Sequence, residues 1–157
     1  VRQKVADALL GFTGKGLTVN MRDGKVYVSL ENSLLFAPGS WDVAPNGKIA
    51  LENLAGVLAE NQDISILVEG HTDNDPYRGA NQVRDNWDLS VMRATNVVKI
   101  LTTNTSLDPK RITAAGRGEY VPLVDNDSAA NKAVNRRTEI ILTPDLSELA
   151  NLLEGEE

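Results

Sequence analysis

The chain of 157 residues contains no cysteine and only one histidine. Without cysteine it can form no disulfide, thiolate metal site or cysteine nucleophile. A zinc site would need histidine or cysteine ligands beyond His71, so we expect no bound metal and no other cofactor. No apolar stretch approaches the roughly 20 residues of a membrane-spanning helix. We therefore expect membrane attachment only through segments outside this chain, which starts at Val1 and is interpreted as a fragment or processed product.

The chain also has no excess of basic residues. The formal net charge is −6 at neutral pH, whereas proteins that bind nucleic acids need a clustered basic surface to contact the phosphates. We therefore exclude nucleic acid as a partner. A small anionic ligand stays possible, because a few local arginines can outweigh the mean charge. The hydrophobic share of 41% is sufficient for one core, so the chain is expected to form one structural unit.

The spacing of apolar residues predicts an α+β fold. Val1, Val5, Leu9 and Phe12 indicate a short N-terminal helix, and two alternating runs around Asp23-Gly24 indicate a hairpin. Further along, the pattern predicts helices over about 45–60 and from Asp85 or Asn86 to 101, and strands over 64–68, 112–115 and 138–142. Polar loops are expected at 74–85 and from 119 to Asn135, and Asp145 is expected to cap a short terminal helix.

Four separated motifs follow one another from residue 70 onward. They are Gly70-His71-Thr72-Asp73, the segment Asn86-Trp87-Asp88-Leu89-Ser90-Val91-Met92-Arg93-Ala94, the turn Gly116-Arg117-Gly118, and Asn135-Arg136-Arg137-Thr138-Glu139. In this order and spacing they resemble the OmpA-like C-terminal domain family, in its MotB-like branch. The resemblance covers 25–143. Together with the apolar spacing, this divides one structural unit into an N-terminal helix and first hairpin strand at 1–24, the OmpA-like domain at 25–143, and a C-terminal helix with an acidic tail at 144–157.

The resemblance implies a mixed βαβαβ sheet with helices packed on one face. It also implies a groove for meso-diaminopimelate, the cross-linking residue of peptidoglycan, held by Asp73 and Arg93 and shaped by Asn86 and Leu89. The free end of this ligand carries an ammonium and a carboxylate on one carbon. An aspartate can accept hydrogen bonds from the ammonium, and a guanidinium can fork onto the carboxylate. Thr72, Phe36 and Arg137 complete the predicted set of ligand-binding residues.

Structural interpretations exist for the same residues. Asp73 alone could be a turn residue that accepts backbone hydrogen bonds, and Arg93 could form a structural ion pair with it. As a ligand contact, Arg93 is expected to be largely hydrated in the free protein. Arg136 and Arg137 alternate on a strand, so one is expected to face solvent and the other to reach the groove or a core carboxylate.

The resulting functional hypothesis is a non-catalytic, periplasmic domain that anchors an envelope protein to the cell wall. Attachment to the outer membrane would come from a preceding segment, and a homodimer is left open. The alternatives are a wall hydrolase that uses Asp73 and Asp75 as an acid–base pair, and a scaffold or stator-type assembly domain.

Overall fold

One five-stranded sheet forms the centre of the fold. The computed structural model describes residues 16–79, 81–144 and 153. The strands are β1 (Leu17–Arg22), β2 (Lys25–Glu31), β3 (Ile64–His71), β4 (Ile112–Gly116) and β5 (Arg137–Pro144), and they lie in the order β1-β2-β5-β3-β4. β3 and β4 are parallel, whereas the other neighbouring strands are antiparallel. The predicted α+β class with a mixed sheet is confirmed.

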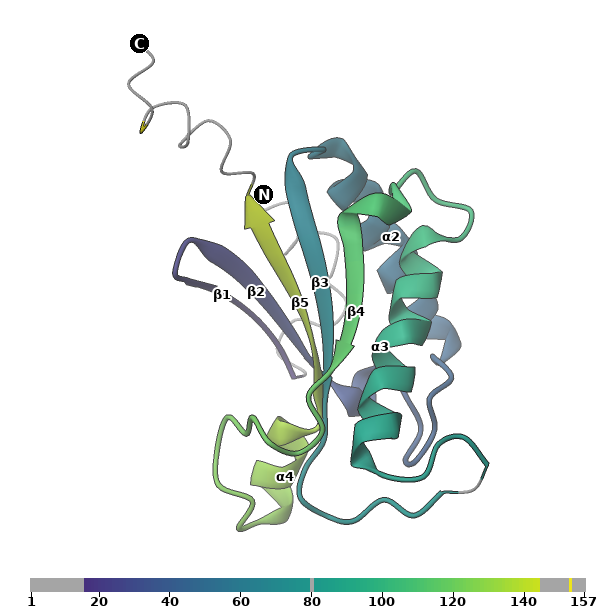
Figure 1. The fold of residues 1–157 in the computed structure, drawn as a ribbon, viewed down its shortest axis with the longest axis vertical. Coiled ribbons are helices and arrows are strands. Elements are labelled where there is room, and N and C mark those ends of the chain that lie inside the picture. The colour runs from purple at the N-terminus through teal and green to yellow at the C-terminus, as the bar shows by residue number, and fades with distance from the viewer. Residues whose placement is uncertain (1–15, 80, 145–152, 154–157) are drawn as a thin grey trace.

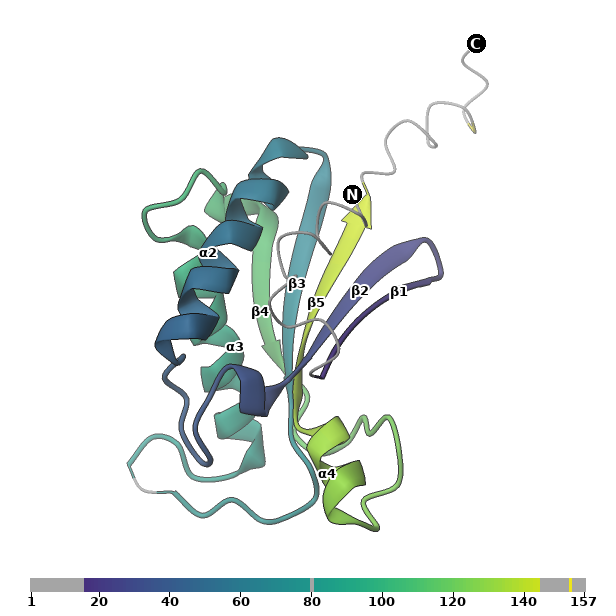
Figure 2. The same ribbon diagram turned by 180° about the vertical axis from the view of Figure 1, so that it is seen from behind.

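Two long helices cover one face of this sheet. Helices α2 (Pro45–Glu60) and α3 (Asn86–Thr102) lie side by side on it, as Figures 1 and 2 show from opposite sides. The helix α4 (Ala129–Asn135) lies apart from them, at the end of the sheet where β5 begins. Two short 3-10 helices, η2 (Asn32–Leu34) and η3 (Pro109–Arg111), follow β2 and precede β4. The prediction of helices packed on one face is therefore confirmed.

The predicted hairpin is the β1–β2 pair. Arg22 pairs with Lys25, so the connection is the two-residue turn Asp23-Gly24. Both turn residues have positive φ, 51° and 76°, which is the backbone that a tight turn between twisted strands requires. Because β2 also pairs with β5, residues 17–22 belong to the same sheet as the rest of the domain.

The core lies between the sheet and the two long helices. Helix α3 starts where the Asp85 side chain accepts a hydrogen bond from the backbone N–H of Asp88, and its inner face buries Leu89, Ala94, Val97 and Leu101. Of these, Ala94, Val97 and Leu101 belong to one core cluster with buried strand residues, among them Val28, Leu30, Ile66, Val68, Ile140 and Leu142. This packing fixes the start of α3, and with it the Asn86–Ala94 segment, beside the end of β3.

The sequence prediction was incomplete at one point. The stretch expected to be loop up to Asn135 contains α4, which begins after Ser128, whose hydroxyl accepts a hydrogen bond from the backbone of Asn131. A seven-residue helix is too short to show an apolar period, so only the capping serine marked it. The predicted helix over residues 1–12 and the one after Asp145 fall outside the described residues. None of the described helices combines the length and apolarity needed for a bilayer span.

Candidate functional site

The Gly70-His71-Thr72-Asp73 motif leaves β3 directly beside the first turns of α3. A Cβ at Gly70 would come within 2.2 Å of the Ser90 carbonyl oxygen, so glycine is what allows the helix to lie this close to the strand. The N–H of Thr72 donates to the carbonyl of Gly118, which ties the motif to the turn after β4. The end of β3, the first turns of α3 and the turn after β4 therefore meet next to Asp73.

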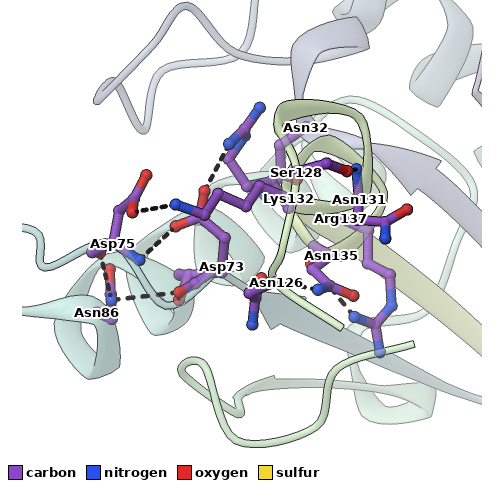
Figure 3. Close-up of polar contacts among 12 residues, drawn as sticks. Asn32, Asp73, Asp75, Asn86, Asn126, Ser128, Asn131, Lys132, Asn135 and Arg137 are labelled. Carbon is purple, nitrogen blue, oxygen red and sulfur yellow. Dashed lines mark hydrogen bonds and ion pairs between the residues drawn. The ribbon is translucent and has the colours of Figure 1, made fainter. Parts of the chain in front are cut away.

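The Asp73 carboxylate is buried, and each of its two oxygens has a partner. Its Oδ1 accepts a hydrogen bond from the backbone N–H of Asp75 at 2.9 Å, and its Oδ2 forms an ion pair with Nη1 of Arg136 at 2.5 Å. The amide of Asn86 donates to the Asp75 carbonyl at 2.9 Å, and Lys132 pairs with the Asp75 carboxylate at 2.8 Å. Figure 3 shows Asp73, Asp75, Asn86 and Lys132 gathered in this network. Asp73 is thus both a turn residue and half of an ion pair, and its partner is Arg136 rather than Arg93.

Arg93 is buried, contrary to the expectation that it is hydrated. Only 5% of it is exposed, because its guanidinium lies over the ring of Phe36, at 4.9 Å from the centroid, and its Nε donates to the Ser40 carbonyl at 2.7 Å. Among residues 16–79 and 81–144, no carboxylate forms an ion pair with it. Burial lowers the pKa of Arg93 to about 10, so it stays charged at neutral pH.

A groove of about 570 Å³ opens beside Arg93. The segment between η2 and α2 contributes its apolar wall, which consists of Phe36, Ala37, Pro38 and Gly39. Asn32, Arg93 and Arg136 contribute polar groups, and Asn32 is itself held by bonds to Thr138 and to the His71 carbonyl. Asp73 is not among the lining residues and is connected to the groove through its ion pair with Arg136. The groove therefore offers one apolar side and two guanidinium groups.

The structure divides the predicted site residues into two groups. Phe36 and Arg93 line the groove. Thr72, Asn86 and Leu89 are buried and lie outside its wall: the Thr72 hydroxyl donates to the Asp73 carbonyl, Asn86 supports the following loop, and Leu89 packs into the interior. These three residues do not face the groove, and Thr72 and Asn86 hold the chain around Asp73 in place.

Arg137 requires a correction. Its side chain is buried, with Nε donating to Glu139 Oε2 at 2.7 Å and Nη2 donating to the Val121 carbonyl at 2.9 Å. Arg136 faces the groove instead. The alternation predicted that one arginine faces solvent and the other reaches the groove or a core carboxylate; Arg137 meets a core carboxylate, whereas Arg136 lines the groove and pairs with Asp73. The alternation could not say which, because that depends on the register of β5 against β2 and β3.

Glu69, His71 and Glu139 bring ligand atoms within 4.8 Å of one another, as a metal site would. However, His71 Nε2 lies 3.1 Å from Glu69 Oε1, and Arg137 pairs with Glu139. A metal ion would therefore have to compete with cationic and hydrogen-bonding partners that the protein already supplies. We therefore interpret Glu69, His71 and Glu139 as part of a polar network and not as a metal site.

This network predicts a dependence of stability on pH. The hydrogen bond with His71 is the largest of the effects that hold the pKa of Glu69 below its usual value of 4.5, against the opposing effect of burial. A carboxyl whose pKa is lower in the folded state stabilises the protein above its unfolded pKa, and this contribution is lost as pH falls through the folded value. We expect thermal melts of the wild type to lose more stability below about pH 4.5 than those of Glu69→Gln. Parallel profiles for the two proteins would contradict this role of Glu69.

A family model described as the OmpA family matches residues 35–136. The chain belongs to the OmpA family. Motility protein B of Bacillus subtilis is 32% identical over 128 residues, which is 82% of this chain and 49% of that protein. This OmpA-family chain spans about half the length of motility protein B and of two further curated relatives.

Solved structures show the same domain. The cell wall anchor of the T6SS from Pseudomonas aeruginosa superposes with a TM-score of 0.80 at 31% identity, covering 92% of this chain and 100% of that one. A MotB-like protein from Desulfovibrio vulgaris gives a TM-score of 0.77 at 30% identity, covering 91% and 93%. These OmpA-family relatives are motility proteins and anchors, which agrees with the prediction that the domain is not an enzyme.

Proposed function

We propose that the domain binds peptidoglycan through the free end of meso-diaminopimelate and so anchors an envelope protein to the cell wall. The observation that carries this proposal is the burial of Arg93 on the groove wall without a carboxylate partner among the described residues. A desolvated charge is costly unless an opposite charge compensates it. A ligand carboxylate would supply that charge. The likeness to a cell wall anchor supports the wall as its source.

The chemistry of the groove fits a zwitterion on one carbon. Arg93 is held by Ser40 and Phe36, so its remaining N–H groups can fork onto a carboxylate with little further ordering. Asp73 provides the negative charge for the ammonium, at the point where its ion pair with Arg136 reaches the groove. The aliphatic chain of the diamino acid would then lie against the apolar wall formed by 36–39.

A hydrolase that uses Asp73 and Asp75 fits the geometry less well. Arg136 already pairs with Asp73, and Lys132 pairs with Asp75. A general acid must hold a proton that it can transfer, and these two carboxylates are each held by a cation instead. We therefore favour binding without bond cleavage.

We also propose where the domain works. It would lie in the periplasm and reach a membrane through segments outside this chain. Relatives that include a probable lipoprotein of Escherichia coli and outer membrane porins support such a location, and the outer membrane stays our preferred site. A stator-type assembly role is the second candidate, because motility protein B and a MotB-like protein are among the relatives. A homodimer is left open.

The choice between diamino acids tests the proposed ligand. Lysine-type stem peptides lack the second carboxylate, so they would leave Arg93 unpaired in the complex. We expect them to bind at least about 30-fold more weakly than meso-diaminopimelate peptides, which corresponds to roughly 2 kcal/mol or more. Isothermal titration with two peptides that differ only at this residue measures the difference. Equal affinities would rule out a carboxylate contact at Arg93.

A further inference from the structure

The ion pair between Asp73 and Arg136 occupies the position that the proposed function assigns to the ligand. Oδ1 of Asp73 is taken by the backbone N–H of Asp75, and Oδ2 is taken by the Arg136 guanidinium. The Asp73 side chain is only 7% exposed, so little of the carboxylate is left for another donor. Because Arg136 is the exposed partner of this buried carboxylate, a ligand ammonium reaches Asp73 most directly by taking the place of Arg136.

The side chain of Arg136 can leave Asp73 without a change in the backbone. Its backbone is fixed, because its N–H donates to the Lys132 carbonyl and its carbonyl accepts from the N–H of Asn32. Its side chain is 43% exposed, and within residues 16–79 and 81–144 its one side-chain hydrogen bond or ion pair is the one with Asp73. An exposed guanidinium on a fixed backbone can change partners by rotating about its side-chain bonds.

A second hollow adjoins the groove on the far side of Arg136. It measures about 360 Å³ and is lined by polar groups of the segment before α4 and of α4 itself, including Asn126, Ser128 and Lys132, with Asp75 opposite. Arg136 lines both hollows. Figure 3 shows Asn126, Ser128 and Lys132 on the α4 side of the network and Asp73 and Asp75 facing them. A guanidinium released from Asp73 thus has a polar space beside it.

Charge balance indicates what that space would receive. Once a ligand ammonium compensates Asp73 and a ligand carboxylate compensates Arg93, the Lys132–Asp75 pair is already neutral. Arg136, which lies between the two hollows, is then a cation without its former ion-pair partner. A further carboxylate would restore the balance. The acidic residue that precedes the diamino acid in a stem peptide carries such a group one residue away.

We infer that Arg136 is an exchangeable counter-ion: the ligand ammonium replaces it on Asp73, and the released guanidinium binds the carboxylate of the neighbouring acidic residue in the second hollow. This inference rests on the proposed function, because it starts from an ammonium at Asp73. It makes Arg136 a specificity-determining residue, which distinguishes stem peptides with a free carboxylate from those in which this carboxylate is amidated.

Calorimetric titration of three ligands tests the exchange: meso-diaminopimelate alone, the γ-D-glutamyl-diaminopimelate dipeptide, and the same dipeptide with its glutamyl carboxylate amidated. We expect the wild type to prefer the free dipeptide over the amidated one by roughly fivefold, as for a partly exposed ion pair. Arg136→Gln should lose this preference. It should bind diaminopimelate alone at least as tightly as the wild type, because the competing cation is gone.

Two further variants keep the test decisive. Arg117→Gln removes another exposed arginine, 3.8 Å from Glu69, and should behave as the wild type with all three ligands. Arg136→Lys retains the charge and should retain part of the preference, even if Arg136→Gln proves too unstable to titrate. Weaker binding of diaminopimelate alone to Arg136→Gln, or no preference in the wild type, would overturn the exchange while leaving the proposed function intact. Failure of the wild type to bind diaminopimelate at all would instead reject the proposed function, and the exchange with it.

Discussion

Replacing Arg93 by methionine should abolish most binding to the cell wall while leaving the protein folded. The variant leaves a ligand carboxylate desolvated and unpaired, which corresponds to a loss of roughly 2–5 kcal/mol in binding free energy. Folding should suffer less. The lost hydrogen bond to the Ser40 carbonyl is offset in part by removal of a desolvated charge that has no ion-pair partner in the described part of the chain. Pull-down with purified peptidoglycan and thermal melts on the same sample measure both effects.

Arg111 provides a matched control for this experiment. It is also an arginine held by backbone carbonyls, since it donates to those of Ile64, Leu58 and Asn61. It lies beside the first residue of β3, whereas the groove lies beyond the last. Arg111→Met should therefore lower the melting temperature without weakening wall binding. If Arg93→Met gave that same pattern, Arg93 would be a structural residue and the central proposal would fail.

Arg137→Met should cause the largest loss of stability among the variants considered. Arg137 and Glu139 are 2% and 6% exposed at the side chain, and their pair is joined at 2.7 Å. Removing one partner leaves a buried charge uncompensated, which costs about 3–5 kcal/mol. For a domain of this size, we expect the melting temperature to fall by roughly 10 °C. Chemical denaturation and calorimetry measure the change.

The double variant distinguishes a buried charge from a general packing defect. Arg137→Met combined with Glu139→Gln leaves no isolated charge, so it should recover part of the stability lost in the single variant. Arg117→Met removes an arginine that is half exposed and should change the unfolding free energy by no more than about 0.5 kcal/mol. If Arg137→Met instead stayed stable and lost wall binding, the original prediction of Arg137 as a ligand residue would be restored.

Several features of this protein were determined by the sequence itself. The Asp23-Gly24 turn follows from local backbone preference, because only a few residue types adopt positive φ at low cost. Helix α3 follows from its apolar period and the capping Asp85, both of which act within a few residues. The four ordered motifs indicated the family, and the family model agrees. The turn and the helix depend on residues that are close together in the sequence. The family is indicated by several such short segments that occur in a fixed order.

The tertiary structure decided how the charges of the site are distributed. Arg93 is buried because Phe36 and the Ser40 carbonyl, more than fifty positions earlier in the chain, close over it. Asp73 pairs with Arg136, 63 positions away, at the C-terminal end of α4, and the next residue, Arg137, begins β5 with its side chain in the interior. Sequence spacing gives the type of each side chain and the period of its element. Which carboxylate a given arginine meets depends on how distant segments pack, and that packing is a property of the whole fold.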